Sequence, residues 1–270
     1  MFEPKDDPSQ PPLSDIQPPI PQEQDVAPWT LNEVMYGVVL TAIIWLIAAV
    51  LLSTYSSHAA SITNSPVKAI LVFLLSALVE GAFVVAPLVI AWRAARAREG
   101  ASRWRVALRG LGFRRFNVPK SIIAIIGFFL LIYLVNFIYQ LLITTFHLPI
   151  QTNDQYILER GRLDPLTTYA TLLAGVLTAP LCEEIFFRGM LLGGLRRSMP
   201  DAPAVIISAF VFALAHFDIG SFAVLLVIGL ILGYLRCRTR SIWPSIGLHL
   251  LNNGYSSLLI VLALNNFIKV

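Results

Sequence analysis

Residues 166–187 read LTTYATLLAGVLTAPLCEEIFF, an apolar run that carries two adjacent glutamates near its end, Glu183 and Glu184. A helix of about 20 apolar residues crosses the hydrocarbon core of a membrane. The run therefore predicts a membrane span that carries charge. Across the 270 residues, 56% are apolar, 13% are charged and the mean hydropathy is +0.71, whereas a soluble domain carries about twice that charge. This composition excludes a disordered chain and an ordinary soluble enzyme. It predicts a multi-pass integral membrane protein, which in a bacterial host would lie in the plasma (inner) membrane.

Six further apolar runs accompany this stretch, and together they predict an all-α membrane bundle of about seven helices. The seven runs are 34–54, 67–92, 122–143, 166–187, 203–217, 222–235 and 242–264. At 1.5 Å per residue, the runs 203–217 and 222–235 cover only about two thirds of the hydrocarbon core. We therefore expect two short helices packed against longer ones. Residues 34–270 then form one membrane domain whose surroundings are lipid.

The charged residues outside the apolar runs predict the topology. Residues 1–33 are rich in proline and hold seven acids against one lysine, a composition typical of a disordered leader. The loop 93–120 holds nine basic residues, which indicates the cytoplasmic side. Seven spans then place the leader in the cytoplasm and the C-terminus outside. Although the pI is near 9.2, the basic residues lie in short loops between spans, so nucleic acid is not an expected partner.

Ionisable side chains inside apolar runs are costly, and each is therefore a candidate functional group. They are Glu80, Glu183, Glu184, Arg188, His216 and His249. Glu184 and Arg188 are four residues apart and share a helical face, where pairing stabilises both charges. Glu183 points about 100° away from that face and has no partner nearby in the sequence. Its carboxylate is free to act as a general base, although a purely structural triplet that holds helices together is the alternative.

Two further runs supply His216 and His249. A single histidine on an apolar helix is more often a core residue than a functional one. His249 and Asn253 are four residues apart, so they can donate hydrogen bonds to one oxyanion or join neighbouring helices. Counted at 1.5 Å per residue from the basic loops, Glu183 and His216 lie about 20 Å deep and His249 about 13 Å deep. We therefore expect Glu183, His216, His249 and Asn253 to share one cavity, open toward the cytoplasmic half.

Three motifs in this order resemble the CAAX protease and bacteriocin-processing family, also called CPBP or Abi. They are Glu183-Glu184-x-x-x-Arg188, Phe212-x-x-x-His216 and His249-x-x-x-Asn253. The resemblance covers about residues 166–264. It implies an all-helical intramembrane endopeptidase that cleaves a peptide or membrane-anchored protein and has these residues at its centre. Glu183, His216, His249 and Asn253 would be catalytic, with Glu184 and Arg188 in support.

The mechanism implied by these residues begins with a water molecule that Glu183 activates and His216 helps to hold. His249 and Asn253 would then stabilise the tetrahedral oxyanion. In a variant of this mechanism, Glu183, His216 and His249 hold zinc, although the pattern does not require a cofactor and no HExxH motif is present. We expect Glu80 to have at most a supporting role.

Two other classes of function stay open at this stage. A proton-coupled transporter could use the buried acids and histidines as a proton path. A non-catalytic membrane scaffold or immunity protein could keep the family's fold without its chemistry. Thiol catalysis by Cys182 is the weaker enzymatic alternative, because this cysteine has no base near it in the sequence.

Overall fold

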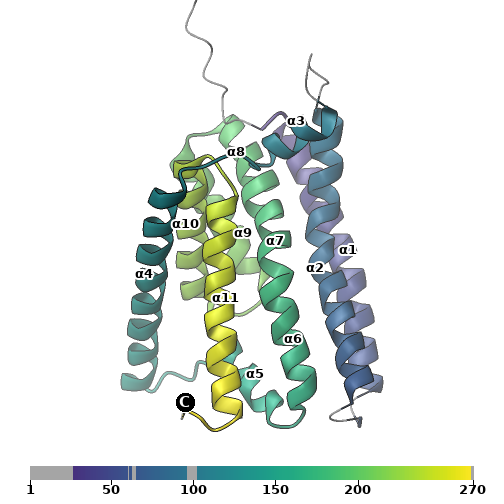
Figure 1. Ribbon diagram of the computed structural model, residues 1–270, viewed down its shortest axis with the longest axis vertical. Helices are drawn as coiled ribbons and strands as arrows, with labels where there is room; N and C mark the ends of the chain where they lie inside the picture. Colours follow the sequence, from purple (N-terminus) through teal and green to yellow (C-terminus); the bar gives the residue numbers. More distant parts are fainter. Residues whose placement is uncertain (1–26, 60, 63–64, 96–101, 269–270) are drawn as a thin grey trace, which may run out of the picture.

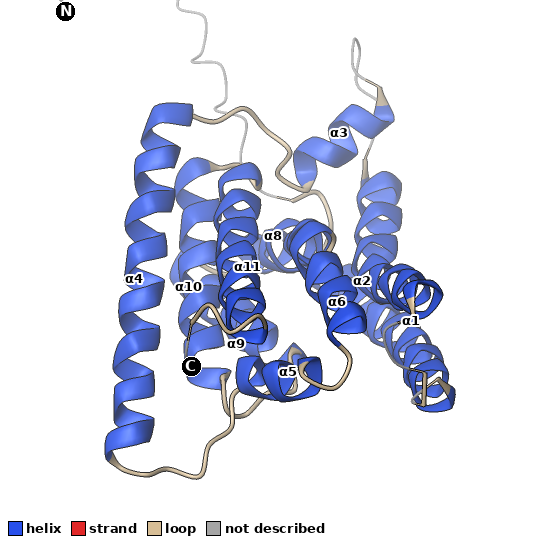
Figure 2. Ribbon diagram, turned by 60° about the horizontal axis from the view of Figure 1, so that its bottom comes forward, coloured by secondary structure: helices blue, strands red, loops and turns tan. Residues whose placement is uncertain are grey.

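The computed structural model describes residues 27–59, 61–62, 65–95 and 102–268, and these residues contain helices and no strand. Figures 1 and 2 show long helices side by side in a bundle, with two short helices at opposite ends. The long helices on the two flanks are α1 (Leu31–His58), α2 (Pro66–Ala94) and α4 (Val118–Thr145). The all-α bundle predicted from the sequence is confirmed.

The middle of the bundle is built from the C-terminal half of the described chain. Its elements are α6 (Pro165–Leu177), α7 (Ala179–Glu184), the π-helical segment η2 (Ile185–Leu191), α8 (Leu192–Ser198), α9 (Asp201–Ala215), α10 (Phe222–Thr239) and α11 (Trp243–Leu264). Residues 165–198 follow one another as a single broken rod. The short helix α3 (Arg103–Gly110) lies at the basic end of the bundle and α5 (Asn153–Gly161) at the other end.

Within the described residues, six helices are long and apolar enough to cross a membrane when residues 165–198 are taken as one, and α9 is a shorter apolar helix. The protein is therefore a multi-pass integral membrane protein, and each of the seven predicted runs corresponds to one helical rod. The α10 helix extends to Thr239 and reaches 18 residues, because arginines continue its last turn beyond the apolar run. Of the two helices expected to be short, only α9, with 15 residues, falls below the spanning length.

Helix termini follow local capping rules. Thr30 caps α1 with a capping box to Glu33, whose carboxylate accepts the Thr30 backbone N–H at 2.7 Å. Ser65 caps α2 and Asn117 caps α4, each followed by a proline in the first turn. These caps fix where the long apolar helices begin.

The predicted leader falls mostly on residues 1–26, which lie outside the described residues. Its last part behaves differently from the expectation, because α1 begins at Leu31 and Trp29 is fully buried. The Trp29 indole N–H donates to the Met190 carbonyl at 3.0 Å. A large aromatic ring with a satisfied N–H gains by burial, so Trp29 and Ala27 are buried against the bundle although the residues around them are mostly exposed.

Candidate active site

The two glutamates lie where the rod formed by residues 165–198 changes geometry. The α6 helix ends at Leu177, and α7 begins at Ala179 with Pro180 in its first turn. Proline has no backbone N–H to donate, so the helical hydrogen bonding is interrupted there. Glu183 and Glu184 end α7, and the π-helical turn η2 follows directly. Such π-helical turns occur frequently at functional sites.

Glu184 is the fully buried centre of a polar network. Its Oε1 accepts a hydrogen bond from Arg188 Nη1 at 2.9 Å and lies 3.0 Å from His249 Nδ1. Arg188 is also fully buried, and its Nη2 donates to the Gly229 carbonyl of α10 at 3.1 Å. The pair predicted from the four-residue spacing is confirmed. It also has a further task, because Glu184 holds the His249 ring.

Glu183 faces both histidines from a different direction. Its Oε2 lies 4.0 Å from His216 Nε2 and 3.9 Å from His249 Nε2, and this buried oxygen makes no hydrogen bond to any described residue. The three side chains come from α7, from the C-terminal end of α9 and from α11. The predicted convergence of these three side chains is therefore confirmed, while their roles in catalysis stay predictions.

The hydrogen bonds of the two imidazoles define which ring nitrogen faces Glu183. His216 Nδ1 lies 2.8 Å from the Phe212 carbonyl, which can only accept a hydrogen bond, so Nδ1 carries the proton. His249 Nδ1 meets the Glu184 carboxylate in the same way. In the neutral rings, both Nε2 atoms are then proton acceptors directed toward Glu183. Such an arrangement can receive a proton from a group that lies between them.

Asn253 lies one helical turn beyond His249 but has partners of its own. Its side-chain amide donates to the Gly175 carbonyl of α6 at 3.2 Å, and its Oδ1 accepts from Asn252 at 3.3 Å. None of the hydrogen bonds found in the described chain joins Asn253 to Glu183 or to a histidine. The structure thus ties Asn253 to α6, and its predicted place in one cavity with the other three residues stays a prediction.

Glu80 lies in α2, which packs against α7 and η2. Its Oε2 is buried and makes no hydrogen bond within the described residues. The sequence-based expectation that Glu80 faces the protein interior is therefore confirmed. No described hydrogen bond links it to either histidine, and its supporting role stays a prediction.

The proposed zinc ligands do not match a tetrahedral site as they are placed. At zinc–ligand distances of 2.0–2.2 Å, neighbouring ligand atoms lie about 3.4 Å apart. Both Nε2 atoms are farther than this from Glu183 Oε2. In the part of the chain that the structure describes, no group of three or more His, Cys, Asp or Glu side chains is arranged to hold a metal ion. We therefore derive no step through zinc.

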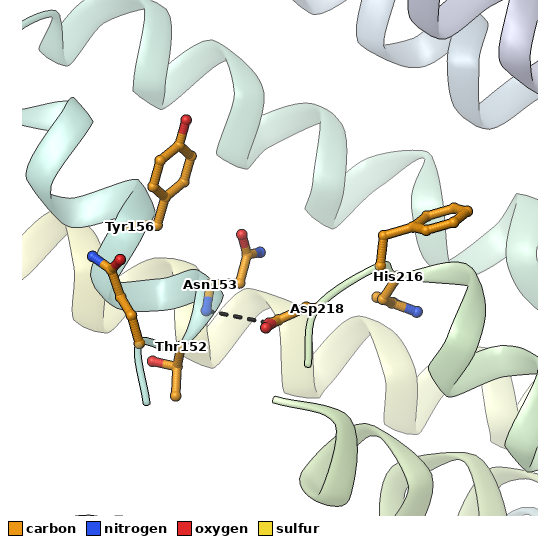
Figure 3. Close-up of a pocket in the computed structure, with 7 residues that line it drawn as sticks. Thr152, Asn153, Tyr156, His216 and Asp218 are labelled. Carbon is orange, nitrogen blue, oxygen red and sulfur yellow. Dashed lines mark hydrogen bonds between the residues drawn. The ribbon is translucent and has the colours of Figure 1, made fainter. Parts of the chain in front are cut away.

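A polar pocket of about 250 Å³ reaches His216 from the end of the bundle that carries α5. Figure 3 shows Thr152, Asn153 and Tyr156 of the α5 region on one side and His216 and Asp218 on the other. The exposed fraction of the side chain falls from 29% at His216 to 11% at Glu183 and 4% at His249. The sequence predicts a cavity open toward the basic, cytoplasmic half, and for this pocket that expectation is wrong. The α9 helix starts at the basic end, and His216 follows its opposite end, where the pocket lies.

Some contacts that shape the site were not anticipated from the sequence. Phe212, already part of the motif with His216, accepts the His216 N–H through its carbonyl, and its ring centroid lies 4.4 Å from Cζ of the Arg188 guanidinium. A Cβ on Gly229 would lie 2.9 Å from Ala209 Cα, so glycine is needed for α10 to approach α9 and present its carbonyl to Arg188. The G-x-x-x-G spacing of Gly229 and Gly233 is the pattern that could have indicated this close helix packing.

The fold and this centre define a membrane protein with a Glu–His–His cluster, and comparison with known proteins finds a match to one family. Residues 165–255 match the family model described as "Type II CAAX prenyl endopeptidase Rce1-like". This segment is about a third of the chain and contains all three motifs. The resemblance to the CAAX protease (CPBP) family is thus confirmed over these residues.

One curated relative is the "Putative membrane peptidase YdiL" of Bacillus subtilis (strain 168), which is 27% identical over 117 residues. The aligned part is 43% of this chain and 46% of that protein, so the chain spans about half the length of the curated relative it matches. No solved structure matches the chain. Both descriptions are of peptidases and support an intramembrane protease at the level of the family.

Proposed function

We propose that this protein is an intramembrane endopeptidase that hydrolyses a peptide bond with a water molecule activated by Glu183. The observation that carries the proposal is the unpartnered Glu183 Oε2 between two imidazole Nε2 atoms at 3.9 and 4.0 Å. These distances are too long for direct hydrogen bonds. A water molecule beside the carboxylate would contact all three groups, and it is the reactant that hydrolysis needs.

Hydrolysis in this site begins when Glu183 Oε2 takes a proton from the water molecule. At the same time the water oxygen attacks the peptide carbonyl carbon. The carbonyl π bond opens and gives a tetrahedral intermediate with an oxyanion. The C–N bond then breaks, and the proton passes from Glu183 to the departing nitrogen with His216 as the relay. The products are a carboxylic acid and an amine, and the Glu183 carboxylate is regenerated. A general base of this kind contributes about 10²–10⁴-fold to a rate.

The oxyanion is assigned to His249 and Asn253. Glu184 accepts the His249 Nδ1–H and so fixes the orientation of the ring. In the imidazolium form of that ring, the Nε2–H can donate to the oxyanion. Asn253 can contribute once its amide leaves the Gly175 carbonyl. One well-placed donor is worth about 3–4 kcal/mol in the transition state. Glu184 and Arg188 act as positioning residues, Glu184 through His249 and Arg188 through the packing of η2 against α10.

The test is peptide cleavage by the purified protein in detergent, with a quenched fluorescent peptide library as substrate. We expect cleavage by the native protein, loss of cleavage in His216→Ala and His249→Ala at equal protein levels, and cleavage that survives a zinc chelator. Survival is expected because the proposed mechanism takes its general base, its proton relay and its oxyanion donors from side chains alone. Loss of activity with the chelator, restored by zinc, would contradict the metal-free mechanism. Proton flux in liposomes without any cleavage would favour the transporter, and a phenotype that survives both substitutions would favour the scaffold.

A further inference from the structure

The helices α9 and α10, which are joined by the turn that begins at His216, end well short of one face of the bundle. The α9 helix has 15 residues and α10 has 18, whereas α1, α2 and α4 have 28 or 29. At 1.5 Å per residue, α9 is about 22 Å long and α4 about 42 Å. The outer ends of α9 and α10 therefore lie inside the bundle, while α4 and α11 continue past them (Figure 1).

A ring contact confirms how deep this turn lies. Phe217, which follows His216 directly, stacks on Trp45 with ring centroids 5.7 Å apart. Trp45 is near the middle of α1. The turn between α9 and α10 thus lies near mid-height of the bundle, and the recess beyond it leads from the α5 end to the reactive centre.

The α5 helix covers this recess and is tied to its walls. The Asn153 backbone N–H donates to Asp218 Oδ2 at 3.2 Å, as Figure 3 shows. Ser256 of α11 donates to Asp154 at 2.9 Å, and the Tyr139 hydroxyl of α4 donates to the Gly220 carbonyl at 2.7 Å. The polar pocket between α5 and the turn at residues 216–218 reaches His216.

The distribution of positive charge tells which face of the membrane this recess meets. The basic end of the bundle carries α3, the ends of α8 and α10, and their arginines, among them Arg103, Arg105, Arg196, Arg197, Arg236 and Arg238. At the opposite end the described basic residues are Lys68, Arg160 and Arg162, and Lys68 pairs with Asp164 at 2.8 Å. Cytoplasmic loops carry the excess of lysine and arginine, so the recess faces the non-cytoplasmic side.

An apolar groove of about 530 Å³ adjoins the polar pocket and shares Phe217 and Asp218 with it. Its apolar lining includes Val211, Leu214, Ile219 and Phe222 of α9, α10 and the turn between them. The polar pocket and the apolar groove together suit a substrate polypeptide with two parts, a polar segment in water and an apolar segment in lipid. Because the groove is continuous with the pocket at His216, its occupant is the membrane-embedded segment next to the cleaved bond.

We infer that the reactive centre is reached from the non-cytoplasmic face through this recess, and that the membrane-anchored substrate implied by the family resemblance is cleaved close to that face. The identity of the substrate rests on the proposed peptidase function. The side from which the centre is reached rests on the charge distribution and on the helix lengths. The polar segment of the substrate enters between α5 and Asp218, and its apolar anchor lies along α9 and α10.

Cysteine labelling tests the direction of access without relying on activity. Asn153→Cys places a thiol in the recess through an exposed side chain, and Arg115→Cys places a matched exposed thiol at the basic end. In right-side-out membrane vesicles, a membrane-impermeant maleimide should label Asn153→Cys above the background of the native protein. It should label Arg115→Cys only after detergent is added. In detergent, a bulky label on Asn153→Cys should slow cleavage of the peptide library by about tenfold or more relative to the same unlabelled variant, and a label on Arg115→Cys should not.

The inference is overturned if Arg115→Cys reacts in the sealed vesicles and Asn153→Cys does not, or if labelled Asn153→Cys cleaves as fast as its unlabelled form. The first outcome leaves the proposed peptidase function intact, because it concerns only the face of access. Conversely, a native protein that cleaves no peptide in detergent contradicts the proposed function, while the vesicle labelling still reports which face the recess meets.

Discussion

Replacement of Glu183 by glutamine is expected to abolish peptide cleavage, whereas the same replacement at Glu80 is expected to leave most of it. A glutamine at position 183 keeps the size of the side chain but cannot take a proton from water, so the rate should fall by about 10³-fold or more. Glu80 Oε2 in α2 is buried and makes no hydrogen bond within the described residues, and glutamine preserves the size and polarity of this side chain. The measurement is the cleavage rate of the purified variants against the native protein.

The pair of variants is its own control, because each removes one buried carboxylate from the same part of the bundle. Equal amounts of folded protein must be compared, as judged by gel filtration in detergent. A comparable loss of cleavage in both variants would make Glu80 part of the catalytic machinery and the assignment of a single catalytic glutamate wrong. Full activity of Glu183→Gln would contradict the mechanism itself.

Replacement of Arg188 by leucine is expected to destabilise the protein severely. Arg188 and Glu184 are both fully buried and lie 2.9 Å apart, so leucine leaves the Glu184 carboxylate without its guanidinium partner. Breaking a buried ion pair by removing one partner costs about 3–5 kcal/mol. The measurement is thermal unfolding of the purified protein in detergent together with its expression level.

Arg196→Leu is the matched control for this prediction. Arg196 pairs with Asp201 at 2.7 Å, but the Asp201 side chain is 57% exposed, and exposed pairs contribute about 0–1 kcal/mol. The double variant Glu184→Gln/Arg188→Leu should recover part of the lost stability, because it no longer buries an unpaired charge. Equal destabilisation by Arg188→Leu and Arg196→Leu would show that the buried network does not stabilise the bundle as described.

Those parts of the fold that depend on apolar length and local spacing could be predicted from the sequence. Seven apolar runs gave seven helical rods, since hydrocarbon requires helices with satisfied backbone groups. The Glu184–Arg188 pair followed from a four-residue spacing, and the convergence of Glu183, His216 and His249 followed from their similar depth. These quantities are counted along the chain and need no knowledge of how the helices pack.

Features that depend on packing between distant segments could not be predicted in this way. Glu184 is also the hydrogen-bond partner of His249. This contact could be predicted only if it were known which carboxylate α11 approaches. Asn253 bonds to Gly175, a carbonyl that nothing in the sequence marks. The direction of the recess was misjudged because depth was counted from one face only. A residue 20 Å from the basic face of a core about 30 Å thick lies past its middle.

Cleavage in ¹⁸O-labelled water, with mass spectrometry of both the peptide products and the intact protein, tests most directly whether a water molecule activated by Glu183 attacks the peptide bond. The account predicts one ¹⁸O atom in the new carboxyl group and an unmodified protein mass throughout turnover, in the native protein and equally in Cys182→Ser. A protein species heavier by the mass of the acyl fragment, together with loss of cleavage in Cys182→Ser, would show that a side-chain nucleophile attacks first and would contradict the account.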